Sequence, residues 1–142
     1  MKRTLTVLLC FAALSAGCSS ARTGSGHRRS LFARKVAPHS SPEALMTAYR
    51  KYAKAGQAEK LWSLYSPDLQ KKAPNGLFAL QDKLRREPVS DIHIGNPVIV
   101  SDSRVLYFNI VTLNRGESIL ERAALIKEND KWFIESLGSD SQ

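Results

Sequence analysis

The amino-acid sequence predicts an α+β domain in which N-terminal helices pack on a curved antiparallel sheet, and two observations favour it. Between residues 41 and 87, apolar side chains recur at the three- and four-residue spacing of amphipathic helices. From residue 89 to 137 the spacing changes to the two-residue alternation that is typical of strands. Helices followed by a meander of about four strands form an α+β domain, because a curved sheet folded over the helices buries one face of each.

The first helix is expected to begin at Ser41, whose side chain can accept a hydrogen bond from a free backbone N–H group. Pro42 suits the first turn of a helix, and Glu43 favours the positive end of the helix dipole. Apolar residues then recur at helical spacing up to Ala53, and Gly56 ends the helix.

Two further helices are predicted, with a turn between them. The second covers residues 58–65, and Ser-Pro-Asp at 66–68 breaks it and opens another turn that runs through Lys72. Pro-Asn-Gly at 74–76 is a strong turn signal. The third helix follows it, and Pro88 stops that helix.

The predicted strands are separated by turn-forming sequences. They are expected at residues 91–100, with an interruption by Gly-Asn-Pro at 95–97, and at residues 105–113, 118–127 and 131–137. Asn-Arg-Gly at 114–116 is typical of a hairpin turn. No internal repeat occurs, so the chain contains one domain after residue 40.

The alternation of side chains assigns faces to these strands. Leu106, Phe108 and Ile110 share one face of the long strand at 105–113, and Trp132 and Ile134 share one face of the last strand. We expect both tryptophans of the chain, Trp62 and Trp132, to pack in the core, with a ligand-binding platform as the alternative.

Residues 1–17 have the anatomy of a secretory signal peptide, with a positively charged start, an apolar run and small residues before Cys18. The apolar run is about a dozen residues, well short of the roughly 20 that a membrane-spanning helix needs. We therefore expect a segment that is removed, and no lasting transmembrane anchor.

The stretch Leu14–Cys18 resembles the lipobox of bacterial lipoproteins, although its leucine stands one place earlier than in the commonest form. The resemblance implies a diacylglyceryl thioether on Cys18, cleavage before it and acylation of the new amine. Ser19 follows in place of aspartate, which resembles the class sorted to the outer membrane, facing the periplasm. An ordinary secretory signal that holds a cysteine near its end is the alternative.

Residues 18–40 are expected to form the lipidated cysteine and a flexible basic tether, since Ser, Gly, Arg and His dominate the first half of the segment. Residues 28–35 mix basic and apolar side chains, which fits either a patch on an anionic membrane surface or a solvated linker. The α+β domain is then assigned to residues 41–142.

The net charge of +8 belongs mainly to the N-terminal segment. Seven of the 21 Lys and Arg residues precede Ser41 and all 13 Asp and Glu residues follow it, so the domain has a net charge of +1. A nucleic-acid partner is therefore not expected. Both cysteines, Cys10 and Cys18, lie before the domain, whose stability must come from an apolar core without a disulfide.

The chain resembles the nuclear transport factor 2-like superfamily in the order of its helices and strands. The resemblance rests on the sequence SPEALMTAYRKYAKAGQAEKLWSLYSPDLQKK at one end and ALIKENDKWFIES at the other. The resemblance covers residues 41 to about 137. It implies a cone of helices and curved sheet that can enclose a pocket, and it implies no single function, since the same cone serves enzymes, ligand binders and assembly modules.

Enzymes of this superfamily place an Asp base or a His/Asp pair in the cone, with Tyr as a hydrogen-bond donor. The nearest counterparts here are Asp91 and His93, which share one face of a strand. Because Ile92 and Ile94 are expected to face the core, we expect this pair to face solvent. Tyr107 and Asn109 share a face of the long strand, which fits either the mouth of a pocket or the outer face of the sheet.

No metal or cofactor is expected. Two of the three histidines, His27 and His39, lie in the predicted tether, and only His93 falls in the domain. No glycine-rich phosphate loop stands at a junction of strand and helix, and no nucleophile with a His/acid set is recognisable.

These observations predict a membrane-tethered lipoprotein of the cell envelope that acts as a non-catalytic binding or assembly module. Its expected partners are the membrane, through the lipid, and an envelope protein or a small apolar ligand. The alternative is a small enzyme with its active site in the cone, for which Asp91 and His93 are the acid/base candidates.

Overall fold

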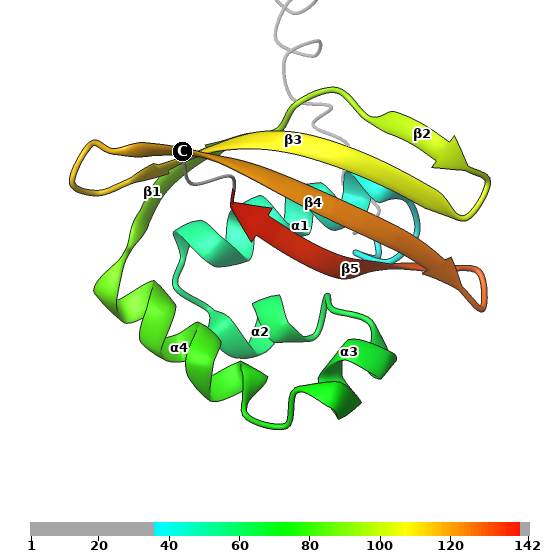
Figure 1. Cartoon of the computed structure of the whole chain (residues 1–142), viewed down its shortest axis with the longest axis horizontal. Coiled ribbons are helices and arrows are strands. Elements are labelled where there is room, and N and C mark those ends of the chain that lie inside the picture. The colour runs from blue at the N-terminus through cyan, green and yellow to red at the C-terminus, as the bar shows by residue number, and fades with distance from the viewer. Residues whose placement is uncertain (1–35, 140–142) are drawn as a thin grey trace, which may run out of the picture. The chain divides into compact units, whose positions relative to one another are not determined.

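The computed structural model describes residues 36–139, in which helices precede an antiparallel sheet (Figure 1). The helices are α1 (Pro42–Lys54), α2 (Ala58–Trp62), α3 (Pro67–Lys72) and α4 (Gly76–Arg86). The strands are β1 (Val89–His93), β2 (Val98–Ser101), β3 (Arg104–Leu113), β4 (Ser118–Glu128) and β5 (Lys131–Ser139). This order confirms the predicted α+β fold. The predicted signal peptide, Cys18 and the tether up to residue 35 lie outside the described residues.

Helix α1 is bounded as its sequence predicts. The Ser41 hydroxyl accepts a hydrogen bond from the Ala44 amide at 3.1 Å, and Pro42 occupies the first turn. Gly56 follows the helix with φ +63°, a backbone conformation that glycine adopts without steric strain. The turn predicted from residue 66 forms a separate helix, α3, which Ser66 caps by accepting from the Leu69 amide at 3.2 Å.

The sheet has the strand order β1-β3-β4-β5, and β2 also pairs with β3. β1 pairs with one half of β3 and β2 with the other half, so the two short strands share one edge of β3. Gly95 lies in the link between them, where a Cβ atom would stand 2.2 Å from the backbone oxygen of Phe108. Only glycine allows the link to run this close to β3, which explains the interruption of the predicted first strand.

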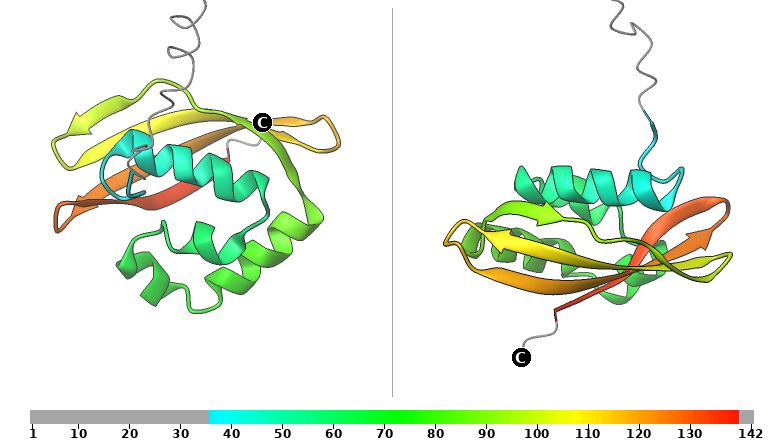
Figure 2. Two further views of the ribbon diagram at one scale, coloured as in Figure 1. Left: turned by 180° about the vertical axis from the view of Figure 1, so that it is seen from behind. Right: turned by 90° about the horizontal axis from the view of Figure 1, so that it is seen from above.

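The helices gather on one side of the sheet, and the chain returns from α4 directly into β1 (Figure 1). Seen from behind, α1 lies along the sheet in front of the strands, while α2 and α4 lie together below it (Figure 2). α1 packs against β1 and β5, and α2 packs against α1 and α4.

The core combines α1 with the inner face of the sheet. Leu45, Met46, Ile92, Leu125 and Ile134 are each fully buried. Trp132 is also buried, which confirms the core face predicted for the last strand.

A face of strand β3 that is rich in apolar side chains points away from the core. Leu106, Phe108 and Ile110 do share one face, but Phe108 is 43% exposed and Ile110 is 46% exposed. The inner face instead carries Tyr107 and Asn109, together with three aliphatic residues. Both faces of this strand are rich in apolar residues, so alternation alone does not decide which one is buried.

The segment before α1 is attached to the last strand. The Trp132 amide donates to the His39 carbonyl at 3.0 Å, and the His39 Nδ1 atom donates to the Trp132 carbonyl at 2.7 Å. The His39 ring also packs on Phe133, with 4.7 Å between ring centroids. The last residues of the predicted tether, up to residue 40, therefore contact the domain.

No helix among residues 36–139 is both long enough and apolar enough to cross a membrane.

Candidate functional site

A cavity of about 490 Å³ lies between the helices and the sheet. Residues from α1, α2, α4 and from four of the five strands line it. Its aliphatic lining includes Leu61, Leu80, Leu84, Leu113, Ile119 and Leu137. A largely apolar cavity of this size, with a few polar groups, has the character of a site for a small ligand.

One carboxylate lies in the buried part of this apolar lining. Glu121, in the middle of β4, is only 8% exposed. Its Oε1 atom accepts a hydrogen bond from the Tyr49 hydroxyl at 2.7 Å and a longer one from the Asn109 amide at 3.4 Å. Within residues 36–139 its second oxygen, Oε2, receives no hydrogen bond. Glu121 therefore has hydrogen-bonding capacity to spare inside the cavity.

Two phenols stand near this carboxylate. Burial, and then the negative charge of Glu121, raise the pKa of Tyr49 and of Tyr65 well above the ordinary value for tyrosine. Both side chains line the cavity, and both stay neutral at physiological pH. Both phenols therefore lie close enough to Glu121 for its charge to act on them.

Trp62 contributes an aromatic wall. Its ring lies 5.1 Å from the ring of Tyr65, between centroids, at an angle of 39°. Gly76, at the start of α4, faces the indole, since a Cβ atom there would stand 2.2 Å from Trp62 Cη2. The absence of a side chain at Gly76 thus fixes where the Trp62 ring lies. Trp62 packs half-buried against the core, as predicted, and also lines the cavity, while its alternative role as a ligand-binding platform stays a prediction.

Charged side chains mark the place where the cavity meets solvent. We call Lys83, Glu87, Arg115 and Glu117 the mouth residues, since all four line the cavity and are exposed or half-exposed. Arg115 lies 2.7 Å from a carboxylate oxygen of Glu117 and 4.0 Å from one of Glu87. The pair with Glu87 links the β3–β4 hairpin to the end of α4.

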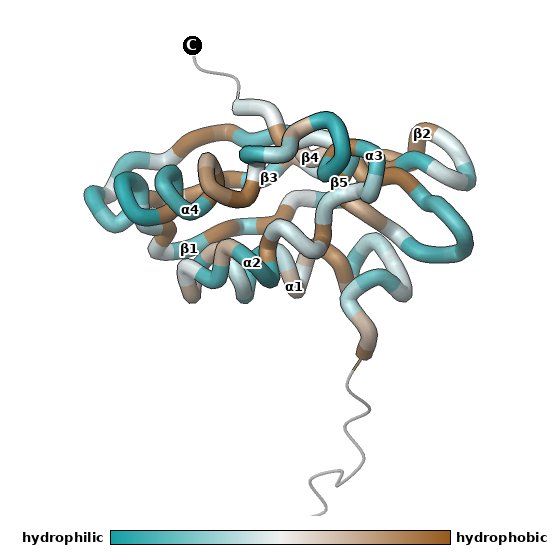
Figure 3. Tube along the Cα trace, turned by 90° about the horizontal axis from the view of Figure 1, so that it is seen from below, coloured by the Kyte–Doolittle hydropathy of each residue, from teal (hydrophilic) through white to brown (hydrophobic). Residues whose placement is uncertain are grey.

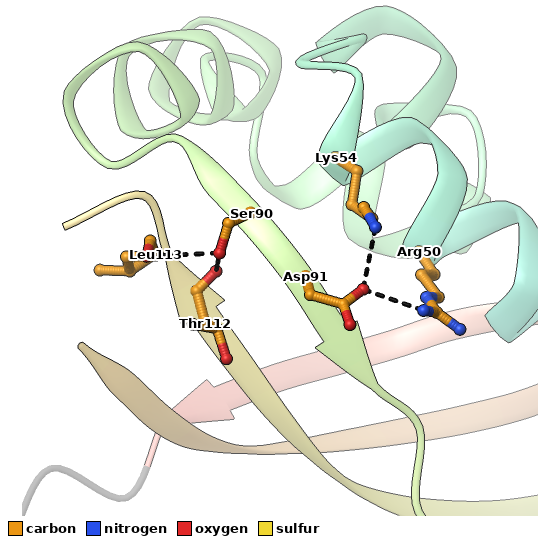
Figure 4. Close-up of polar contacts among 6 residues, drawn as sticks. All are labelled: Arg50, Lys54, Ser90, Asp91, Thr112 and Leu113. Carbon is orange, nitrogen blue, oxygen red and sulfur yellow. Dashed lines mark hydrogen bonds and ion pairs between the residues drawn. The ribbon is translucent and has the colours of Figure 1, made fainter. Parts of the chain in front are cut away.

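The predicted acid/base candidates lie away from the cavity. His93 is exposed, and the side chain of Asp91 is half-exposed, which confirms that the pair faces solvent. Asp91 Oδ1 accepts from Lys54 Nζ at 3.0 Å and from Arg50 Nη2 at 2.9 Å (Figure 4). These two hydrogen bonds lower the pKa of Asp91 to about 2, and the bond from Lys54 contributes more than the bond from Arg50. Asp91 thus holds α1 against β1, which is a structural role.

The neighbour of Asp91 also stabilises this edge of the sheet. The Ser90 hydroxyl donates to the carbonyl oxygens of Thr112 at 3.0 Å and Leu113 at 3.4 Å, at an irregularity in the pairing of β1 with β3 (Figure 4).

Tyr107 and Asn109 point inward from β3, so neither lies on the outer face of the sheet, and neither lines the mouth of the cavity. Tyr107 is 2% exposed and Asn109 is fully buried. Asn109 lies directly opposite Glu121 in the pairing of β3 with β4, and its amide reaches that carboxylate. The Tyr107 hydroxyl and the Asn109 Oδ1 atom have no hydrogen-bond partner in the described part of the chain.

Glu121 itself was not identified from the sequence, although a signal for it exists. In β4, Ile119, Glu121, Ala123 and Leu125 occupy alternate positions, and three of these four residues are apolar. A strand that buries its aliphatic face therefore buries the carboxylate with it.

The outer face of the sheet carries a second feature. Phe108, Ile110 and Leu120 are all exposed there, and Ile110 pairs directly with Leu120. The short strand β2 adds an exposed apolar run at residues 98–100, which appears brown in Figure 3.

No three His, Cys, Asp or Glu side chains among residues 36–139 are grouped so that they could hold a metal ion.

No protein-family model and no curated protein matches this chain. Two solved structures resemble it. A SEC-C motif containing protein from Rhodopseudomonas palustris aligns over 72% of this chain and 80% of its own, with 16% identity and a TM-score of 0.59. A DUF4783 family protein from Bacteroides ovatus aligns over 73% of this chain and 97% of its own, with 15% identity and a TM-score of 0.54.

At this level of identity the likeness establishes the α+β fold and nothing about activity. The resemblance to the nuclear transport factor 2-like superfamily stays a prediction.

Proposed function

We propose that this protein is a membrane-tethered, non-catalytic binding module of the cell envelope, and that its cavity holds a small, partly apolar ligand. The observation that carries the proposal is the cavity itself, with a volume of about 490 Å³ and a lining that is mainly aliphatic and aromatic. A cavity of this volume accommodates a molecule of roughly drug size.

The tether and the lipid anchor rest on the sequence of the first 40 residues. The Leu14–Cys18 stretch resembles a lipobox, and Ser19 resembles a signal for the outer membrane, so we place the domain at that membrane, facing the periplasm. Expected partners are the membrane and, through the exposed apolar residues of the outer sheet face, an envelope protein. No nucleic-acid partner is proposed, since the domain is nearly neutral.

The alternative function is a small enzyme, and one observation favours it. Glu121 lies in the cavity and accepts a hydrogen bond from Tyr49, which is a pairing that proton-transfer sites use. We prefer the binding module because Asp91 and His93, the candidates from the sequence, lie outside the cavity. A ligand recovered unchanged after prolonged incubation supports binding, and recovery of a rearranged or cleaved ligand would support the enzyme.

Ligand binding is tested on the full chain reconstituted in lipid nanodiscs, with isothermal titration of 4-phenylbutanol and subtraction of the signal from empty nanodiscs. Leu80→Trp adds a large side chain to the cavity lining and is expected to abolish binding. Phe78→Trp on the same helix is the matched control, since Phe78 is 74% exposed and lies outside the lining. Absence of binding to the unaltered chain, or equal binding by both variants, contradicts the proposal.

The anchor is tested separately. Cells supplied with a labelled fatty acid are expected to label the full chain and not a Cys18→Ala variant. Equal labelling of the two would remove the lipid anchor from the proposal and leave the cavity in place.

A further inference from the structure

The ionisable residues that line the cavity do not balance in charge. Two of them, Lys83 and Arg115, are cationic, whereas Glu87, Glu117 and Glu121 are anionic, so the lining carries a net charge of −1. Arg115 is already paired with the two carboxylates at the mouth. Glu121 forms no ion pair with any residue between 36 and 139, and it is the most buried of the three carboxylates.

The hydrogen bonds of Glu121 leave a place for a donor. Both of its bonds within the described chain go to Oε1, from Tyr49 and from Asn109. Oε2 is not among the buried atoms that lack a partner, so it can be reached from the cavity, and a carboxylate that is only 8% exposed has lost most of its hydration. A ligand that brings a positively charged group with N–H donors to Oε2 supplies both an opposite charge and a hydrogen bond to that oxygen.

Aromatic side chains line the same cavity. Tyr49, Trp62 and Tyr65 all contribute to its wall, and the rings of Trp62 and Tyr65 lie 5.1 Å apart. The faces of aromatic rings are electronegative and attract cations, and a desolvated site strengthens this attraction. Aromatic rings that surround a cation are a recurring arrangement for the recognition of organic ammonium groups, and the Glu121 carboxylate adds an opposite charge beside them here.

We propose that the ligand of this cavity is an organic cation, an amine whose ammonium group lies between the Glu121 carboxylate and the rings of Trp62 and Tyr65. Its apolar body lies against the aliphatic lining, which includes Leu80, Leu84 and Leu137. This inference rests on the proposed function, because it names the chemical class of the ligand that the cavity holds. Lys83 and Arg115 at the mouth favour an anion, although Arg115 is paired with two carboxylates, so the test includes an anionic probe.

The experiment compares three probes that share one apolar body and differ in the polar end: 4-phenylbutylammonium, 4-phenylbutanol and 4-phenylbutyrate. Each is titrated calorimetrically into the full chain in lipid nanodiscs, with empty nanodiscs as the reference. The ammonium is expected to bind about tenfold or more tightly than the alcohol, since it forms a charge-assisted hydrogen bond with Glu121. The carboxylate is expected to bind most weakly.

Glu121→Gln is expected to bring the affinity for the ammonium down to that for the alcohol. Glu117→Gln is the matched control, because it removes the same charge from the mouth, where Glu117 is paired with Arg115. This control is expected to keep most of the preference for the ammonium. Circular dichroism establishes that each variant folds, and the ranking of the three probes on the unaltered chain tests the inference even when Glu121→Gln does not fold.

The outcomes separate the two proposals. If the three probes bind equally, if the carboxylate binds best, or if Glu117→Gln removes the preference as fully as Glu121→Gln, the inference of an organic cation is overturned and the binding module stands. If none of the probes binds, the proposed function fails and the inference fails with it.

Discussion

The Tyr49 hydroxyl donates a 2.7 Å hydrogen bond to the Glu121 carboxylate and so joins α1 to β4, two elements that are 72 residues apart at this contact. The bond is buried, and it is the shorter of the two that Glu121 accepts in the described chain. It therefore fixes both the helix against the sheet and the carboxylate within the cavity.

Tyr49→Phe is expected to lower the free energy of unfolding by about 1–3 kcal/mol, because it leaves a buried carboxylate with only the long bond from Asn109. Urea unfolding of the purified protein measures the change. Tyr52→Phe on the same helix is the control, with an expected effect within about 0.5 kcal/mol, since its hydroxyl forms no hydrogen bond with residues 36–139. Equal losses in the two variants would show that the Tyr49–Glu121 bond does not stabilise the fold.

Gly76→Ala is expected to displace the Trp62 ring, because the new methyl group would stand 2.2 Å from Cη2 of the indole. The overpacking is expected to cost about 1–3 kcal/mol of stability and to change the tryptophan fluorescence spectrum. It also alters the cavity wall, so the affinity for 4-phenylbutanol should change. Gly138→Ala is the control, since nothing lies within 4 Å of a Cβ atom there. An unchanged spectrum in Gly76→Ala would contradict the contact.

The stability of the domain is expected to fall between about pH 4 and pH 2, and Asp91 contributes to this fall. Its hydrogen bonds to Lys54 and Arg50 lower its pKa from 3.8 to about 2 in the folded protein. Because the folded state holds this carboxyl ionised, the stabilisation is complete above the unfolded pKa and is lost as the pH falls through the folded value.

Asp91→Asn removes this contribution, so the variant is expected to lose less stability than the parent when the pH is lowered from 5 to 2. Unfolding by urea at a series of pH values measures the difference between the two curves. Parallel curves would mean that Asp91 has the same pKa in the folded and unfolded states. The effect should diminish in high salt, since the side chain is half-exposed.

Trp132→Ala is expected to cost about 3–5 kcal/mol, as the truncation of a large buried aromatic residue does. His93→Gln should change the stability by less than about 0.5 kcal/mol, because His93 is exposed. Urea unfolding of both variants checks this contrast. A strong effect of His93→Gln together with a weak effect of Trp132→Ala would mean that the inner and outer faces of the strands are exchanged.

Most boundaries of the elements follow from local chemistry, so the sequence predicts them, although the second helix, expected over residues 58–65, ends at Trp62. The cap at Ser41, the positive φ of Gly56 and the turns between strands depend on a few neighbouring residues. The fold class then follows from the order of these elements. The splitting of the first strand into β1 and β2 is also visible in its Gly-Asn-Pro interruption.

The faces of β3 and the identity of the buried carboxylate depend on tertiary contacts, which local patterns describe less well. Phe108 and Ile110 are more apolar than Asn109, yet Asn109 is the buried residue, and its amide donates to Glu121, which lies opposite it on the same face. Glu121 in turn is stabilised by Tyr49, which comes from a helix far away in the chain. Asn and Glu residues are mostly exposed in proteins, and they can be buried when residues far away in the chain form hydrogen bonds with them.

The attachment of His39 to Trp132 also has a mechanical consequence. Its two hydrogen bonds lie between Val36, where the described chain begins, and the start of α1. Tension applied to the chain ahead of Val36 is therefore transmitted to β5 before it reaches the helix. Since β5 is paired along its length with β4, we expect the load to be shared among many backbone hydrogen bonds of the sheet before it reaches the first turn of α1.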